Sequence, residues 1–371
     1  MSRRREVATR ARRFHSNSRP LARRACNHSI FLRGRAIANR HIISESTMNR
    51  IALSLTIAAT FLLLALPATS AHAQASRTWV SGVGDDANPC SRTAPCKTFA
   101  GAISKTALNG EINCLDPGGF GAVTIVKSIT IDCHEIFASV LFSGTNGINI
   151  PFNSFAATDT RKTVRLRNLN LNGVDTGLVG IRISGGSTIA GGVVIIEDTL
   201  IDGVFAGSAS GILDDRTGGG ELYVSNTTVR NTGTFGIAYN PGAAGQRLEI
   251  ALDNVRVQNS ANIGILIGNN GRAMINRAVV TGNAQIGVGA SGGAAASEIN
   301  LSNSVVSNNG LGVGNLNGTV TVRLSNNDIS FNATAFSGVT LSHFNNRIQG
   351  NNALGPAPTP IGSTSNPTGL Q

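Results

Sequence analysis

A nine-residue pattern recurs through most of the chain and restricts it to a repetitive β fold. Apolar and polar residues alternate, a central residue that is often asparagine follows, and a second short alternation completes the pattern. The copies are TIVKSITID (124–132), VRLRNLNLN (164–172), VIIEDTLID (194–202), LYVSNTTVR (222–230), IALDNVRVQ (250–258), AMINRAVVT (273–281), INLSNSVVS (299–307), VRLSNNDIS (322–330) and LSHFNNRIQ (341–349). Their central residues lie 19 to 40 positions apart. Such a period is typical of a solenoid.

The alternation within each copy has period two, which predicts two strands with one buried face each. A third short strand precedes each next copy, as in GINI (147–150) and GILI (264–267). Enrichment in β-branched residues and glycine argues against helices. Three strands in each coil, stacked on the same strands of the next coil, predict an all-β fold of the parallel β-helix type with about nine or ten coils.

The central residue has a structural role in this arrangement. We expect it at the tight bend between the second and third strands, where a non-glycine residue must adopt unusual backbone angles. Asparagine suits that position, and its amide can bond the backbone and its copies in neighbouring coils. The central residue of the first copy is Ser128. The asparagines assigned this structural role are Asn168, Asn226, Asn254, Asn303, Asn326 and Asn345.

The N-terminal region differs from the rest. Residues 48–73 combine Arg50, an apolar run, a proline and a small-residue AHA site, which is the pattern of a signal peptide. A retained N-terminal anchor is the alternative, but the run is short for a membrane span. Residues 1–47 contain twelve Arg and only two acidic residues. We interpret this basic leader as a miscalled translation start at 1–47 rather than a nucleic-acid-binding arm.

Charge and cysteine content support export. Residues 1–75 hold 13 of the 31 Lys and Arg, so residues 76–371 carry 18 basic and 18 acidic residues. Without an excess of basic residues, we expect no nucleic-acid partner. The remaining cysteines are an even set of four, which predicts two disulfides and a location outside the cytoplasm. We prefer Cys90–Cys96 and Cys114–Cys133 because each pair is close in sequence, whereas the spacings do not favour zinc.

One segment carries a family resemblance. WVSGVGDDANPCSRTAPCKTFAGAI (79–103) resembles the entry to exported right-handed parallel β-helix proteins of the pectin-lyase-like superfamily, in which an aromatic–Val–Ser start and a Gly–x–Asp–x–Asn–Pro turn lead into a capping helix. GEINCLDPGGF (110–120) is similar to that family's first coil. The resemblance implies an N-terminal cap at 76–109, with a helix near 97–107, and a right-handed β-helix at 110–352. The Pro-, Gly- and Ser-rich residues 353–371 predict a flexible tail. The superfamily includes lyases, hydrolases and non-catalytic proteins, so the resemblance specifies a fold rather than a function.

Candidate catalytic residues are few. Enzymes of the superfamily use the outer face of the first strand, where this chain offers Asn149, Arg182 and otherwise mostly small or apolar residues. GILDDRTGGG (211–220) is the best candidate, because Asp214 and Asp215 leave that strand together and could act as general acid and base beside Arg182. An ordinary solvated turn is the alternative.

Two further groups are weaker candidates for binding. Asp85, Asp86 and Asn88 could bind calcium, although an Asx-stabilised turn explains them equally simply. Lys127, Arg165 and Arg167 could bind an acidic glycan, or they could pair with acidic residues of neighbouring coils. For His134 and His343 we expect structural roles. Apart from calcium at that turn, we expect no cofactor.

These observations favour an exported monomer, in the periplasm, on the cell surface or secreted, with no stable membrane span after cleavage. We expect a non-catalytic glycan-binding or surface scaffold whose partner is a polysaccharide or cell-surface glycan. A polysaccharide lyase or glycoside hydrolase using Asp214 and Asp215 is the alternative. The scarcity of exposed aromatic residues argues against a processive glycan enzyme, because sugar rings pack on flat apolar surfaces. Tyr223 is the aromatic residue expected to be exposed on a strand.

Overall fold

The computed structural model describes residues 48, 50, 52–58, 74–186, 191–242, 245–317 and 319–361. The chain divides into two compact units, Met1–Ser70 and Ala71–Gln371. In the first unit the described residues are helical. Within the described ranges, no helix is both long and apolar enough to cross a membrane. The basic leader at 1–47 and most of the signal peptide at 48–73 lie outside these ranges and stay predictions.

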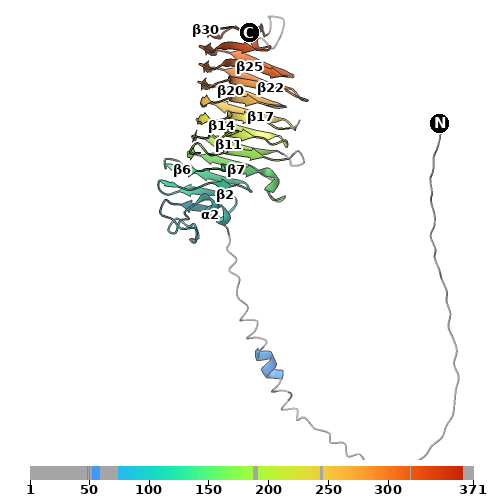
Figure 1. Ribbon diagram of the computed structural model, residues 1–371. Coiled ribbons are helices and arrows are strands. Elements are labelled where there is room, and N and C mark those ends of the chain that lie inside the picture. The colour runs from blue at the N-terminus through green and yellow to red at the C-terminus, as the bar shows by residue number, and fades with distance from the viewer. Residues whose placement is uncertain are drawn as a thin grey trace, which may run out of the picture. The chain divides into compact units, whose positions relative to one another are not determined.

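The second unit is a right-handed parallel β-helix, seen in Figure 1 as a column of stacked coils. Its strands form three all-parallel sheets, which we name A, B and C. Each coil runs from sheet C to sheet A to sheet B. Sheet C has nine strands, so nine coils of the described chain contribute a strand to every sheet. The expectation of a β-helix with about nine or ten coils is therefore confirmed.

The strands of sheet A are β1 (Ala75–Val80), β2 (Thr106–Cys114), β5 (Ile129–Asp132), β8 (Thr163–Arg167), β11 (Gly192–Glu197), β14 (Gly220–Ser225), β17 (Leu248–Asp253), β20 (Gly271–Asn276), β23 (Ser297–Ser302), β26 (Val320–Ser325), β29 (Leu341–Ser342) and β31 (Thr359–Pro360). Those of sheet B are β3 (Gly118–Gly119), β6 (Ala138–Leu141), β9 (Leu169–Asn172), β12 (Leu200–Asp202), β15 (Thr228–Thr232), β18 (Arg256–Ser260), β21 (Val279–Thr281), β24 (Val305–Ser307), β27 (Asp328–Ser330) and β30 (Arg347–Gln349). Those of sheet C are β4 (Val123–Thr124), β7 (Asn146–Pro151), β10 (Val179–Ser184), β13 (Ser210–Asp214), β16 (Phe235–Tyr239), β19 (Ile263–Ile267), β22 (Ile286–Ser291), β25 (Leu311–Asn317) and β28 (Thr334–Ser337).

The core consists of rows of identical strand positions that stack along the coil axis. One row of sheet A contains Leu166, Ile196, Val224, Leu252 and Ile275, which pair in register and are all buried. Because neighbouring strands lie about 4.8 Å apart, each side chain packs directly on its counterparts above and below. Burial of these rows supplies the main stabilising free energy of the solenoid.

A short helix covers the N-terminal end of the core. Helix α2 (Phe99–Lys105) begins after Thr98, whose hydroxyl accepts a hydrogen bond from Gly101 N. Phe99 is buried, and its ring centroid lies 5.1 Å from that of Phe120 in the first coil. The helix therefore shields apolar residues that would otherwise end the stack exposed.

The central residues of the repeat lie at the bend between sheets A and B. Seven of the nine have left-handed backbone angles, with φ between 49° and 56°, and these are Asn168, Asp198, Asn226, Asn254, Arg277, Asn303 and Asn326. Their side chains also bond between coils. The amide of Asn254 donates to Asn226 Oδ1 over 2.8 Å, and the amide of Asn326 donates to Asn303 Oδ1 over 2.7 Å.

The first and last of the predicted central residues, Ser128 and Asn345, lack the left-handed backbone angle of the other seven. Strand β5 begins at Ile129, so Ser128 precedes the strand and Cys133 takes the corner position beneath Asn168. The error arose because the first copy matches the repeat in two registers. In the last coil Phe344 adopts the left-handed angle (φ 60°), while Asn345 Oδ1 still accepts a hydrogen bond from Asn326 N at 2.9 Å.

Disulfides tie the cap and the first two coils. Cys90–Cys96 and Cys114–Cys133 form the two expected pairs, with Cα–Cα distances of 4.7 and 4.8 Å. Asn113 and Asp132 are register partners, so Cys114 and Cys133 occupy the same corner position in successive coils. The second disulfide thus links the first two positions of the column of bend residues that Asn168 and the later asparagines continue.

A second asparagine ladder, which the sequence analysis did not identify, lies inside the bend between sheets B and C. The amides of Asn283, Asn309 and Asn332 each donate to the asparagine of the next coil over 2.9–3.0 Å, and the ladder ends at Asn351. Asn283, Asn309 and Asn332 are buried. Each bond satisfies polar groups that would otherwise be buried without a partner.

The predicted flexible tail is partly wrong. Residues 353–361 belong to the fold: Phe336 N donates to Leu354 O at 3.0 Å, and β31 pairs with β29. Backbone groups of the last coils need partners, and these residues supply them despite their Pro- and Gly-rich composition. The remainder of the predicted tail, 362–371, lies outside the described residues.

Candidate functional site

Asp214 and Asp215, the predicted catalytic pair, lie on opposite sides of sheet C. Asp214 ends strand β13, pairs in register with Ile183 and Tyr239, and is fully buried in the interior. Asp215 follows on the outer side. Because successive strand residues point to opposite faces, two adjacent acids cannot share one site here. The hypothesis that they act together as general acid and base is therefore wrong.

Asp214 forms a buried ion pair with Arg216. Arg216 Nε and Nη2 lie 3.0 and 2.9 Å from Asp214 Oδ2, and both side chains are almost completely excluded from solvent. The guanidinium also donates to Gly192 O at 2.6 Å and to Glu221 O at 2.9 Å. Four contacts thus saturate most of its donors, which is the condition under which a buried arginine is tolerated.

The glycine-rich loops around this pair provide its space. The Arg216 guanidinium lies 5.2 Å from the ring centroid of Phe152, which begins the short 3₁₀ helix η1 (Phe152–Ser154). A Cβ on Gly192 would lie 2.1 Å from that ring, and one on Gly220 would lie 3.1 Å from Arg216 Nη1. The glycines at 192 and 220 therefore leave room for the internal ion pair and the ring beside it.

Burial also determines the acid–base properties of this cluster. Desolvation raises the pKa of Asp214 from 3.8 to about 6, and the positive charge and hydrogen bonds of Arg216 oppose this rise. Burial, together with the charge of Asp214, raises the pKa of Tyr239 to about 12. The Tyr239 hydroxyl is buried and has no hydrogen-bond partner among the described residues.

Asp215 and Arg182 form a separate contact on the outer face of sheet C. Arg182 Nη2 and Nε lie 2.8 and 3.2 Å from Asp215 Oδ2, and the two side chains are 43 % and 23 % exposed. The structure thus brings Arg182 together with Asp215 but not with Asp214. This contact joins successive coils.

Apart from Asn149 and Arg182, that outer row is apolar or lacks a side chain, as the sequence predicts. In register it contains Asn149, Arg182, Leu213, Ala238, Leu266, Gly289 and Gly314. Ala238 and Leu266 form a small cluster with Ile263 outside the main core, and Phe235 and Ile286 pack against it. From the fifth coil onward, this face is therefore covered by its own side chains.

The calcium candidates build a turn. Asp86 accepts hydrogen bonds from Lys97 N, Thr98 N and Thr98 Oγ1 over 2.7–2.9 Å, so both carboxylate oxygens are engaged. Burial opposes ionisation of Asp86, but these bonds and the Lys105 charge lower its pKa overall. Asp85 accepts from Ala87 N, and the amide of Asn88 donates to Pro95 O. No group of three or more His, Cys, Asp or Glu side chains placed to hold a metal ion is found within the described ranges. Calcium binding stays an untested prediction.

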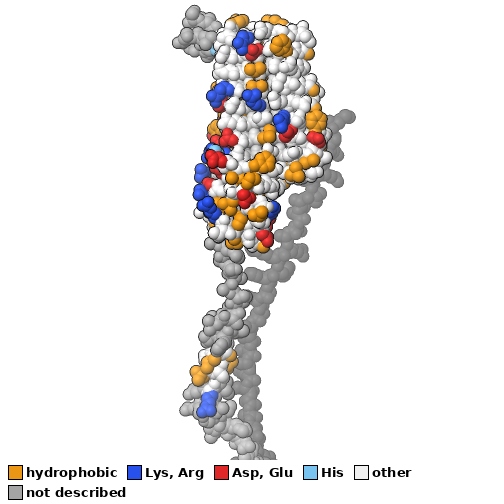
Figure 2. Space-filling view, turned by 90° about the vertical axis from the view of Figure 1, so that its left-hand side faces the viewer, with side chains coloured by type: hydrophobic (Ala, Val, Ile, Leu, Met, Phe, Trp, Pro, Cys, Tyr) orange, Lys and Arg blue, Asp and Glu red, His pale blue; other side chains and the backbone are white. Residues whose placement is uncertain are grey.

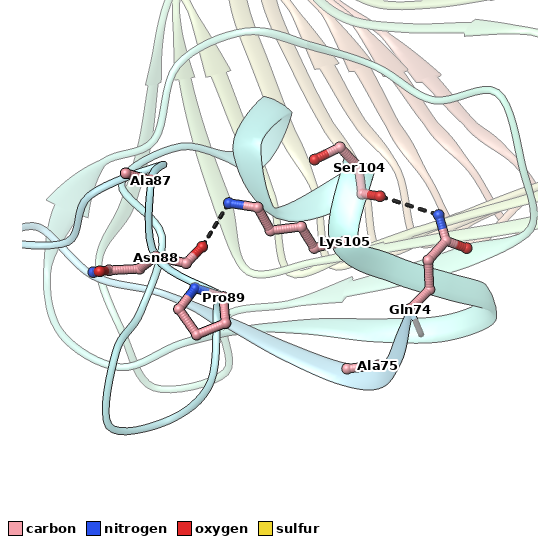
Figure 3. Close-up of a pocket in the computed structure, with 7 residues that line it drawn as sticks. All are labelled: Gln74, Ala75, Ala87, Asn88, Pro89, Ser104 and Lys105. Atoms are coloured by element: carbon pink, nitrogen blue, oxygen red, sulfur yellow. Dashed lines mark hydrogen bonds between the residues drawn. The ribbon is translucent and has the colours of Figure 1, made fainter. Parts of the chain in front are cut away.

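A cleft of about 400 Å³ lies beside the N-terminal cap (Figure 3). Gln74, Ala75, Pro89 and Lys105 are among the residues that line it. The Lys105 ammonium donates to Asn88 O at 2.5 Å, and the Gln74 amide donates to Ser104 O at 3.0 Å. Its polar groups are thus largely engaged in holding helix α2 against the preceding turn.

Of the three sheets, sheet A has the most charged residues on its strands. Arg165 pairs with Glu197 at 2.6 Å, and Arg167 lies 3.6 and 3.5 Å from Asp132 and Asp198. The ammonium of Lys127 instead donates to Thr106 O, and burial lowers its pKa. Figure 2 shows basic and acidic side chains interspersed on the face it presents. Arg165 and Arg167 are thus paired with acidic residues of neighbouring coils, and Lys127 with a backbone carbonyl; binding of an acidic glycan by this group stays a prediction.

The two histidines have no shared site. His134 is exposed beside Glu135, with 3.5 Å between Nε2 and Oε1. His343 lies in the last coil, where its backbone N donates to Leu324 O at 3.1 Å.

Tyr223 is exposed on sheet A, as expected from the sequence. Its side chain is 41 % exposed, and its hydroxyl donates to Glu221 Oε2 over 2.8 Å. This hydrogen bond, together with burial and the charges of Glu221 and Glu249, raises the pKa of Tyr223. The Tyr223 ring thus lies on the surface, with its hydroxyl bonded to Glu221.

Comparisons with known proteins give structural matches alone. No family model matches the chain, and no curated protein does. The lacto-N-biosidase of glycoside hydrolase family 136 from Eubacterium ramulus matches with a TM-score of 0.47 and 11% identity over 76% of this chain and 67% of its own. Pectate lyase Pel9A matches with a TM-score of 0.42 and 14% identity, over 76% of this chain and 79% of its own. The A-module of Azotobacter vinelandii mannuronan C-5 epimerase AlgE4 matches with a TM-score of 0.42 and 14% identity, over 68% of this chain and 91% of its own. The fold assignment rests on the three parallel sheets themselves.

Proposed function

We propose that this protein is an exported, monomeric β-helix scaffold that binds a polysaccharide or cell-surface glycan without cleaving it. The observation that supports the proposal most is the buried position of Asp214. Its carboxylate is bonded to Arg216 inside the coil and cannot reach a substrate. Since glycoside hydrolysis requires two placed carboxylates, the strongest catalytic candidate of the sequence loses one member.

Other features are consistent with a binding scaffold outside the cytoplasm. Two disulfides stabilise the N-terminal end, which is typical of exported proteins. The balance of 18 basic and 18 acidic residues at 76–371 offers no general attraction for nucleic acid. An exposed tyrosine with a carboxylate beside it is a common element of sugar recognition.

The test measures cleavage and binding on the same samples. The full chain, with folding verified, is incubated with neutral, amino-sugar and acidic polysaccharides, with and without calcium. Size-exclusion chromatography then measures chain length, and affinity electrophoresis measures binding. We expect intact chains and retarded migration with at least one glycan.

The alternative of a lyase or hydrolase would now depend on Asp215 and Arg182. Shortened chains with the parent protein, and intact chains with Asp215→Asn, would establish that alternative and refute the proposal. Absence of both cleavage and retardation with every glycan would also refute it.

A further inference from the structure

One row on the outer face of sheet A places a small side chain between two long ones. Tyr223, Ala251 and Met274 pair in register on strands β14, β17 and β20. Tyr223 and Met274 are 41 % and 50 % exposed, whereas the small side chain between them is half-buried. Two strand spacings separate the long side chains, about 10 Å. We call the space over Ala251 the saddle.

On one side of the saddle, the adjacent outward row carries two carboxylates and one guanidinium. Glu221, Glu249 and Arg272 are register partners in the adjacent outward row. Arg272 Nη1 lies 3.6 Å from Glu249 Oε1, whereas the described partner of the Glu221 carboxylate is the Tyr223 hydroxyl. Two glutamates opposite each other on neighbouring strands repel, which is unfavourable for stability alone. Such a pair instead offers several acceptor positions to a ligand rich in hydroxyl donors.

The other side of the saddle is also polar. Ser225, Asp253 and Asn276 form the next outward row. Asp253 Oδ1 accepts from the Asn276 amide at 2.8 Å, and Arg277 also bonds this carboxylate. The apolar floor is therefore narrow and bordered by hydrogen-bonding groups on both sides, as in sites that recognise polar rings with apolar faces.

We propose that the saddle binds one pyranose ring of a neutral polysaccharide. The ring packs against Tyr223 over Ala251, and its vicinal hydroxyls donate to Glu221 and Glu249. The carboxylates would repel a uronate, so charge complementarity selects a neutral sugar. This inference rests on the proposed glycan-binding function and locates that function on sheet A rather than on the outer face of sheet C.

Isothermal titration of the full chain with cellohexaose, mannohexaose and hexagalacturonate tests the inference. We expect a neutral hexasaccharide to bind and hexagalacturonate to bind at least tenfold more weakly. Tyr223→Ala should weaken binding about tenfold, because a ring contact of this kind contributes on the order of that factor. Ala251→Leu should abolish binding by filling the saddle without removing any contact.

Phe205→Ala is the matched control, because it removes an aromatic ring that is 44 % exposed outside this row. It should bind like the parent. Circular dichroism and thermal melts establish that each variant is folded. If Tyr223→Ala does not fold, Ala251→Leu still tests the inference. Parent-like binding by Ala251→Leu would overturn the saddle but leave glycan binding intact. Preference for hexagalacturonate would overturn the charge argument. Absence of binding by the parent to any glycan would overturn the proposed function itself.

Discussion

Replacement of Arg216 by methionine should destabilise the protein strongly. The variant leaves the fully buried Asp214 carboxylate without its counter-charge and removes the donors to Gly192 O and Glu221 O. Breaking one partner of a buried ion pair costs about 3–5 kcal/mol at neutral pH. Asp214→Leu combined with Arg216→Met should recover much of this loss, because it removes the unpaired charge while keeping apolar volume.

Urea denaturation of the parent, the single variant and the double variant measures these free energies of unfolding. A loss below about 1 kcal/mol in the single variant would refute the assigned ion pair. A double variant that is no more stable than the single variant would show that packing around Phe152, rather than charge, dominates the cluster.

The same cluster predicts a dependence of stability on pH. The pKa of Asp214 is raised from 3.8 to about 6 in the folded state, so the folded protein holds the proton more tightly. The stabilisation is complete below the unfolded pKa and is lost as the pH rises through 6. From pH 5 to 7 the free energy of unfolding should fall by about 1–2 kcal/mol from this group. Asp214→Asn should remove that slope, and an unchanged slope would contradict the assignment.

Three further changes test the packing of the coils by urea denaturation. Gly192→Ala should cost about 1–3 kcal/mol, because its Cβ would lie 2.1 Å from the Phe152 ring, and a neutral effect would contradict the packing described here. Asn254→Ala should cost about 2 kcal/mol, because it loses the hydrogen bond to Asn226 and places alanine at a φ of 52°. Asn254→Gly should cost less, because glycine adopts this backbone angle without strain. Equal costs of the two variants would indicate that the backbone angle is not strained. Cys114→Ser with Cys133→Ser should cost about 3 kcal/mol, since the pair closes a loop with a sequence separation of 19, and loss of Cys90–Cys96 alone provides the comparison.

The sequence predicted features that repeat, because repetition makes the period and the buried face visible. The left-handed corner at Asn226 or Asn254 could be inferred from one residue type at one position. Tyr223 could be placed outside by simple alternation from buried Val224. The inner ladder left a weaker signal: Asn283 and Asn309 each follow a buried valine by three positions, but in loops that differ in length and composition.

The position of a residue could not be predicted where a charged side chain stands in an otherwise apolar interior row. Asp214 stands in an interior row between Ile183 and Tyr239, and alternation alone would have placed it inside. Its charge argued for the surface, because an isolated buried carboxylate is costly. The compensation comes from Arg216 and from carbonyl groups of two other strands, and such long-range partners are not visible in a local pattern. The saddle was missed for a similar reason, since it depends on which residues of separate coils become neighbours.

The disulfide between Cys114 and Cys133 makes the two ends of the solenoid unequal in stability. In a solenoid each coil touches only its neighbours, so coils are lost from the ends rather than from the middle. The N-terminal end is closed by helix α2 and by a bond that thermal fluctuation cannot open. In the last coil the strands of sheets A and B, β29 and β30, are two and three residues long, and the described chain adds β31 beyond them. Under tension or proteolysis the coils should therefore unfold from the C-terminal end first, and the N-terminal coils should unfold last.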